Sequence, residues 1–104
     1  MLTKVKPAFQ LKDLGLFRQQ CYIDGKWADA DDRKTLAVHN PADGQQLGTV
    51  PNLGVAETRR AIEAANAAWP AWRAKLAKER AAILRKWFEL IMANQEDLAV
   101  LMTC

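Results

Sequence analysis

Two cysteines and one histidine are the side chains in this sequence best suited to nucleophilic or metal chemistry. Cys21 and Cys104 lie far apart in the chain, with His39 between them. A cysteine nucleophile needs a nearby base, or the positive end of a helix, to form its thiolate. Cys21 lies in a predicted strand, and Cys104 lies at the negative end of a predicted helix. We therefore predict that both thiols are inert, and that His39 is structural or exposed.

Other catalytic and ligand-binding patterns are equally sparse. The cysteines form no CxxC pair and cannot build a zinc site with one histidine. The acids Asp29, Asp31 and Asp32 share a loop that lacks the glycine and closing glutamate of a calcium loop, so we expect a solvated loop. Serine is absent, and no glycine-rich phosphate-binding motif or HExxH motif occurs. The residues therefore assign no catalytic, cofactor-binding or metal-binding site.

Length and composition fit one small globular unit. The chain has 104 residues, of which 50% are hydrophobic and 26% charged. No apolar run reaches the length of a membrane span, and the first residues lack the apolar core of a secretory signal. These features predict a cytoplasmic location, where a disulfide is not expected.

Charge is unevenly distributed along the chain. Residues 59–86 hold two acids but eight bases, which are Arg59, Arg60, Arg73, Lys75, Lys78, Arg80, Arg85 and Lys86. Such a stretch, with Trp69 and Trp72, is compatible with a free-standing basic helical module that binds an acidic partner or nucleic acid. It is also compatible with a solvated helix face, or with acidic partners elsewhere in a larger protein.

The first half of the chain predicts an arm followed by two β-hairpins. Residues 1–17 are interpreted as an arm with a short helical turn near LKDLGLF. Residues 18–52 are predicted to form the hairpins, and Asp24-Gly25 is a strong signal for the first turn. In the second, Asn40-Pro41 breaks the strand, Asp43-Gly44 turns the chain, and Pro51 stops the return strand.

The second half predicts a helical hairpin over residues 55–104. The first helix carries one face of Val55, Ile62, Ala65, Trp69 and Trp72, and Pro70 is expected to interrupt it near its end. The second is expected to run to the last residue, because one apolar stripe continues through Leu84, Trp87, Phe88, Ile91, Leu98, Leu101 and Met102. Its uncapped, apolar final turn predicts that the chain is the front part of a longer protein.

Four segments occur in an informative order: YIDGKW, VHNPADGQQLGTVP, ETRRAIEAANAAWPAWRA and AKERAAILRKWFELIMANQEDLAVLMT. Together they resemble the N-terminal region of the aldehyde dehydrogenase superfamily over about residues 14–104. Within it, they resemble most the NAD(P)-dependent succinate-semialdehyde dehydrogenases and their glutarate-semialdehyde relatives. The resemblance implies an α+β fragment, with short hairpins before two long amphipathic helices, on the Rossmann-like cofactor-domain side of such an enzyme.

The resemblance also implies a chemistry that this chain does not contain. Family enzymes oxidise an aldehyde through a cysteine thiohemiacetal, pass hydride to NAD or NADP, and hydrolyse the thioester with help from a glutamate. Those residues lie downstream of this segment, so Cys21 and Cys104 do not correspond to the nucleophile, and residues 1–104 alone are expected to be inactive. In some members backbone carbonyls at the positions of Val38 and His39 help hold a monovalent cation, but the acidic ligand is missing here.

The expected partners follow from the same resemblance. The rest of the parent enzyme is the first, and self-association into dimers or larger species is the second, because two helices and a few strands leave apolar faces uncovered. One departure from the family is Leu76, where a hydroxyl residue often forms a capping box with Glu79.

Overall fold

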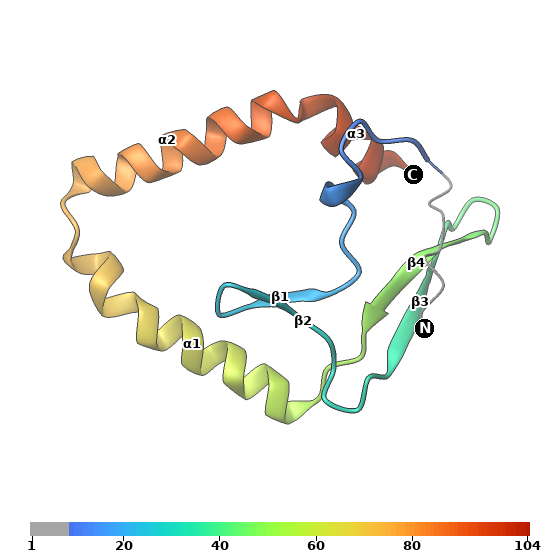
Figure 1. Ribbon diagram of the computed structural model, residues 1–104, viewed down its shortest axis with the longest axis horizontal. Helices are drawn as coiled ribbons and strands as arrows, with labels where there is room; N and C mark the ends of the chain where they lie inside the picture. The colour runs from blue at the N-terminus through green and yellow to red at the C-terminus, as the bar shows by residue number, and fades with distance from the viewer. Residues whose placement is uncertain (1–8) are drawn as a thin grey trace.

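The computed structural model describes residues 9–104, and the part of the predicted arm within residues 1–8 lies outside the described residues. The expected short helical turn is present as a 3-10 helix, η1 (Leu14–Leu16). The Asp13 carboxylate starts it by accepting a hydrogen bond from the Gly15 N–H at 2.9 Å. In the view of Figure 1, α1 (Val55–Ala74) and α2 (Ala77–Ala93) form two sides of an open frame, and the hairpin of β1 (Cys21–Ile23) and β2 (Lys26–Ala28) is drawn between them.

The first hairpin pairs β1 (Cys21–Ile23) with β2 (Lys26–Ala28) in antiparallel register. Its turn is Asp24-Gly25, with φ angles of 52° and 73°. This confirms the predicted turn, because both central residues of such a tight turn need positive φ. Tyr22 faces Trp27 across the hairpin, and their ring centroids lie 5.0 Å apart.

The second hairpin pairs β3 (Thr35–His39) with β4 (Gln46–Pro51) and forms a separate two-stranded sheet. A register irregularity lies between Val38 and His39, where the chain leaves the strand for its turn. The Asn40 side chain accepts a hydrogen bond from the Ala42 N–H at 2.9 Å, and Gly44 adopts a φ of 75°. The predicted strand, turn and return strand are confirmed.

Helix α1 (Val55–Ala74) contains Pro70 and continues past it. The prediction that Pro70 interrupts the helix is therefore wrong. Proline removes one backbone donor and crowds the carbonyl four residues earlier. Here alanines surround it and carry the helix for one more turn, because alanine is the strongest helix former.

The predicted second helix is divided into α2 (Ala77–Ala93) and α3 (Gln95–Thr103), so the prediction of one helix to the C-terminus is also wrong. Asn94 causes the break with φ and ψ of −112° and 21°. Its backbone N–H and its side-chain amide both donate to the Leu90 carbonyl, at 3.2 and 2.8 Å. A side chain that bonds a last-turn carbonyl favours a helix end.

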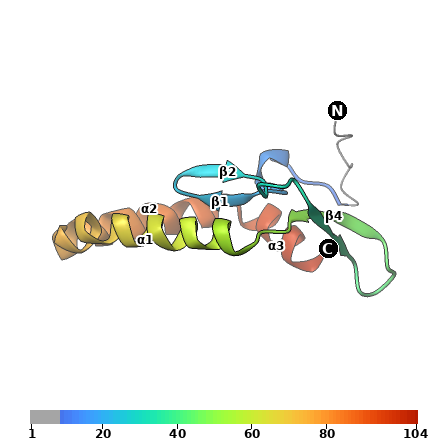
Figure 2. The ribbon, with the colours of Figure 1, turned by 90° about the horizontal axis from the view of Figure 1, so that it is seen from below.

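The helices do not close into the expected hairpin. Figure 1 shows α1 and α2 diverging from their connection. The β1–β2 hairpin lies against one side of α1 (Figure 2), and an open cavity separates its turn from four alanines of that helix: Ala61, Ala64, Ala65 and Ala68. Among residues 9–104, no helix is both long and apolar enough to span a membrane.

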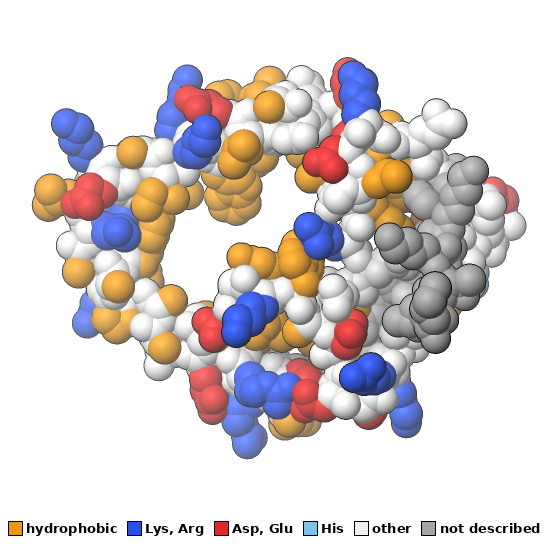
Figure 3. Space-filling model, viewed as in Figure 1, with side chains coloured by type: hydrophobic (Ala, Val, Ile, Leu, Met, Phe, Trp, Pro, Cys, Tyr) orange, Lys and Arg blue, Asp and Glu red, His pale blue; other side chains and the backbone are white. Residues whose placement is uncertain are grey.

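The apolar side chains are largely uncovered. Ala30 is buried at 3% exposure, but no large apolar side chain among residues 9–104 is fully buried. The accessible surface is 8670 Å², against about 5,900 Å² for a compact monomer of this mass. The radius of gyration is 16.8 Å, against roughly 13 Å for a compact domain of this length. Figure 3 shows hydrophobic side chains along the rim of the central opening.

Leu76 occupies the position before α2 and makes no side-chain capping bond, whereas the Glu79 carboxylate accepts from the Leu76 N–H at 3.3 Å. Half of a capping box is therefore present. We predict that Leu76→Thr supplies the other half and raises the free energy of unfolding by about 0.5–2 kcal/mol. Thermal unfolding followed by circular dichroism tests this, and an unchanged or lower midpoint would count against it.

Candidate functional site

The side chains singled out for nucleophilic or metal chemistry are not brought together into a site. Cys21 on β1 and Cys104 after α3 are free and half-buried, and the Cys104 thiol lies 3.2 Å from the Leu101 carbonyl oxygen. His39 is exposed at the end of β3. Among residues 9–104, no group of three or more His, Cys, Asp or Glu side chains is placed to hold a metal ion.

The three carboxylates of the acidic loop bond to other residues of the chain. The Asp29 carboxylate accepts from the Gln20 side-chain amide at 3.1 Å, and the Asp32 carboxylate accepts from the Lys34 N–H at 2.9 Å. Asp31 pairs with Arg60 on α1 at 2.6 Å. The three carboxylates are each engaged by a different donor, which is not the convergent arrangement of a calcium site.

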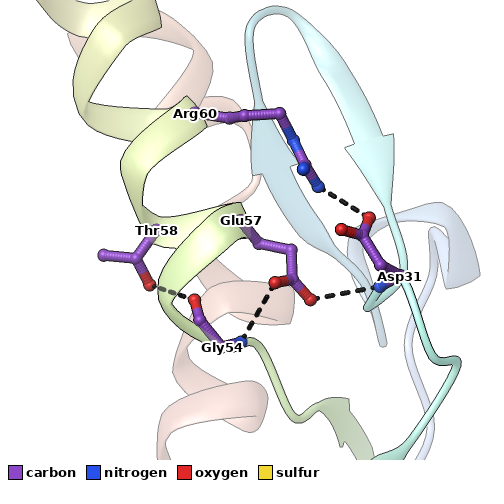
Figure 4. A network of polar contacts seen from close by, with 5 residues as sticks. All are labelled: Asp31, Gly54, Glu57, Thr58 and Arg60. Atoms are coloured by element: carbon purple, nitrogen blue, oxygen red, sulfur yellow. Dashed lines mark hydrogen bonds and ion pairs between the residues drawn. The ribbon is translucent and has the colours of Figure 1, made fainter.

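A buried carboxylate fixes this loop to the start of α1 (Figure 4). Glu57 is only 7% exposed. One of its oxygens accepts from the Gly54 N–H at 3.3 Å, and the other accepts from the Asp31 N–H at 3.1 Å. Arg60, one turn later, then holds the Asp31 side chain. We call these four residues the Glu57 junction, and it joins segments 26 positions apart in the sequence.

The charges of the Glu57 junction are well matched. The hydrogen bond to Asp31 is the largest cause that raises the pKa of Arg60, so the guanidinium stays charged. Desolvation opposes that shift, while the negative charges of Asp31, Glu57 and Glu63 support it. Because the Glu57 carboxylate lies at the positive end of α1, it also satisfies the helix dipole.

A second buried carboxylate ties the arm to α3. Asp97 is 6% exposed. Its two oxygens accept from the Lys12 and Asp13 N–H groups, both at 2.9 Å. These hydrogen bonds, first from Lys12 and then from Asp13, lower the pKa of Asp97 and outweigh the effect of its burial. We call this contact the Asp97 clasp.

The Asp97 clasp makes the stability of the fold depend on pH. A carboxyl whose pKa is lowered by folding stabilises the fold above its unfolded pKa of about 3.9, and this contribution is lost as the pH falls below that value. We predict that Asp97→Asn lowers the thermal midpoint at pH 7, and that the gap from wild type shrinks at pH 3. Melting curves at both pH values test this, and a gap that widens in acid would contradict it.

A cavity of about 210 Å³ lies where the arm, the second hairpin and α3 meet. Its wall is mainly apolar and includes Phe9, Phe17, Val38, Leu47, Leu101 and Cys104. Gly48 on β4 permits this packing, because an added Cβ would lie 2.8 Å from the Gln19 side-chain oxygen and 2.9 Å from the Phe17 ring. That same oxygen accepts from the Thr49 N–H at 2.9 Å.

We predict that Gly48→Ala destabilises this meeting point. The new methyl group must displace Phe17 and Gln19, and overpacking of this kind costs about 1–3 kcal/mol. Chemical denaturation monitored by tryptophan fluorescence measures the loss. A denaturation midpoint equal to that of the wild type would show that the arm moves aside without cost.

Both buried carboxylates were missed from the sequence, although a local signal exists. Glu57, Glu79 and Asp97 each occur three residues after the residue that precedes a helix, namely Gly54, Leu76 and Asn94. An acid in the first turn of a helix is a start signal. That signal locates the helix ends, but it does not reveal the distant N–H groups at Asp31, Lys12 and Asp13.

Comparisons with known proteins agree with this fold. Residues 27–104 match the model of the aldehyde dehydrogenase family. The chain is 66% identical over 94 residues to the glutarate-semialdehyde dehydrogenase of Pseudomonas putida strain KT2440, and this match covers 90% of the chain. It is 58% identical over 94 residues, again 90% of the chain, to the succinate-semialdehyde dehydrogenase of Escherichia coli K12, whose name specifies NADP(+).

A solved structure of the same family also superposes on this chain. The crystal structure of an aldehyde dehydrogenase from Brucella melitensis biovar abortus 2308 superposes with a TM-score of 0.88 at 54% identity. That match covers 91% of this chain and 20% of the crystallised one. The chain likewise spans 20% of the length of each of the two curated relatives. The predicted resemblance is confirmed, and the chain belongs to the aldehyde dehydrogenase family.

Proposed function

We propose that this chain is the N-terminal structural portion of an enzyme that oxidises succinate semialdehyde or glutarate semialdehyde to the dicarboxylate with NAD or NADP. The observation that carries the proposal is the 66% identity to a glutarate-semialdehyde dehydrogenase over 90% of the chain. Because the chain spans a fifth of that relative, we assign the activity to the longer polypeptide and expect residues 1–104 to be inactive by themselves.

We expect the dinucleotide to be held outside the described residues. Helix N-termini are the usual phosphate sites, because their free N–H groups and their dipoles favour anions. Here Glu57 and Glu79 accept from the N–H groups of Gly54 and Leu76, just before α1 and α2, whereas Asp97 in the first turn of α3 accepts from the arm. We expect none of these groups to hold a cofactor phosphate, and we derive no reaction step through NAD or NADP from residues 9–104.

The contribution of this chain is architectural. Its hairpins and helices would lie on the cofactor-domain side of the enzyme, in the cytoplasm, with their apolar faces covered by the rest of the polypeptide. The alternative, a basic module for nucleic acid or an acidic partner, is not favoured. Two of its arginines are paired internally, since Arg60 binds Asp31 and Arg85 lies 3.7 Å from Glu89.

The test uses two proteins. The first is the 104-residue chain, with its intact mass checked in the same sample, and we expect no aldehyde-dependent formation of NAD(P)H. The second is a chimera of the Pseudomonas putida relative in which this chain replaces the matched 94 residues. We expect the chimera to oxidise both semialdehydes. Activity of the chain alone would overturn the architectural role, and an inactive chimera would overturn the family-specific role.

A further inference from the structure

Arg80 is a charged residue on the apolar face of α2. Its neighbours one turn and two turns along the same face are Ile83, Leu84 and Trp87, which are 46%, 51% and 63% exposed. Phe88 and Ile91 extend the face toward the end of the helix and are also exposed. A cation at the start of an apolar stripe is unusual, because such stripes normally face a protein interior.

Arg80 is half-buried, and one nitrogen of its guanidinium lacks a compensating bond. Its Nε is buried and has no hydrogen-bond partner among residues 9–104. Buried polar groups in native proteins nearly always find a partner, and a guanidinium is matched best by a carboxylate that accepts two parallel N–H bonds. The geometry of α2 therefore lacks an acceptor at this position.

The acids of α2 are not available to Arg80. The Glu79 carboxylate accepts from the Leu76 N–H at 3.3 Å, and Glu89 lies 3.7 Å from Arg85. The surrounding segment is also strongly basic, with eight bases and two acids over residues 59–86. Charge complementarity thus favours an acceptor that comes from outside this chain, on an acidic surface.

We propose that Arg80 anchors the exposed α2 face to the part of the dehydrogenase that extends beyond this chain, through a carboxylate on an otherwise apolar surface. The inference rests on the proposed function, which makes this chain one portion of a longer enzyme. Arg80 is a positioning residue: its ion pair sets the register of α2 on that surface. Ile83, Leu84 and Trp87 supply the apolar contact around the pair.

The first experiment compares arginines on two sides of one helix. In the chimera with the Pseudomonas putida relative, Arg80→Met should lower the thermal midpoint by several degrees, and Arg80→Lys should lower it less. Arg85→Met is the matched control on the polar side, where the arginine side chain is 71% exposed, and loss of its surface pair with Glu89 should lower the midpoint much less than Arg80→Met. In the 104-residue chain alone, Arg80→Met should not reduce helicity, because no bond is lost there.

The second experiment identifies the acceptor. A carbodiimide joins an amine to a carboxylate in contact with it, forming an amide and releasing the activated oxygen as a urea. Applied to the Arg80→Lys chimera, it should give a cross-linked peptide that connects α2 to an Asp or Glu outside the grafted segment. A cross-link only to acids within residues 9–104 would overturn the inference.

The outcomes separate this inference from the proposed function. An active chimera in which Arg80→Met and Arg85→Met melt alike overturns the Arg80 anchor and leaves the proposed function standing. Equal loss of helicity in the chimera and in the isolated chain also overturns it, because Arg80 would then act within the chain. An inactive, unassembled chimera overturns both.

Discussion

Replacing Glu57 with alanine is expected to release the Asp31 loop from the start of α1 and to lower the free energy of unfolding by about 2–4 kcal/mol. Two backbone N–H groups, of Gly54 and Asp31, lose their acceptor at a position that is only 7% exposed. Gly54 and Asp31 are themselves exposed, so their N–H groups can bond water in the variant, and each lost bond to the charged acceptor costs about 1–2 kcal/mol. Chemical denaturation followed by circular dichroism measures the change.

Two variants separate the loss of the Glu57 hydrogen bonds from the general effect of removing an acid from α1. Glu63→Ala removes an exposed acid from the same helix and should change stability little, since surface substitutions usually stay within about 0.5 kcal/mol. Glu57→Gln keeps one acceptor oxygen and should fall between wild type and Glu57→Ala. Equal stability of the Glu57→Ala and Glu63→Ala variants would refute the role assigned to the Glu57 junction.

The isolated 104-residue chain is expected to form dimers or larger species at micromolar concentration. Its surface exceeds that of a compact monomer by roughly 2,800 Å², and a standard interface needs only about 800 Å² from each partner. The exposed apolar side chains include Leu84 and Phe88 on α2. Sedimentation velocity over a range of concentrations measures the association.

Substitutions on the two sides of α2 separate apolar association from charge effects. Leu84→Lys combined with Phe88→Lys should shift the population strongly toward monomer. Arg85→Gln combined with Glu89→Gln changes the polar side of the same helix and should leave the distribution as it was. A single, cooperatively melting monomer in the wild-type chain would contradict the association expected here.

Local signals predicted the local structure well. Asp24-Gly25 predicted its turn because few residue pairs tolerate two successive positive φ angles. Asn40-Pro41 and Asp43-Gly44 located the second hairpin for similar reasons. The family resemblance was also visible from segment order, although each segment is weak alone.

The errors came from competition between local terms. At Pro70 the helix loses one backbone hydrogen bond, but the helix propensity of the surrounding alanines offsets that loss and the helix continues. At Asn94 the apolar stripe hid a break, although asparagine followed by Glu96 and Asp97 is a helix start signal. The divergence of α1 from α2 had no local signal, because it depends on which surfaces the helices contact.

The candidate sites were harder because they join distant segments. The acceptor that Glu57 provides for Asp31 lies 26 residues away, and Asp97 reaches Lys12 across 85 residues. Nothing in the identity of Lys12 or Asp13 marks them, since their backbone N–H groups make the contact. Arg80 was visible as one base among eight, but only the structure shows that its Nε lacks an acceptor among residues 9–104.

The Asp97 clasp has a consequence for the protein as it is made. A ribosome adds about 5–20 residues per second, so Asp97, which lies 85 residues after Lys12, is added roughly 4–17 s later. During that interval both hairpins, α1 and α2 have been synthesised, and the arm can bond the second hairpin through Gln19 and Thr49. The Lys12 and Asp13 N–H groups are therefore without their carboxylate in every nascent chain until Asp97 has been added.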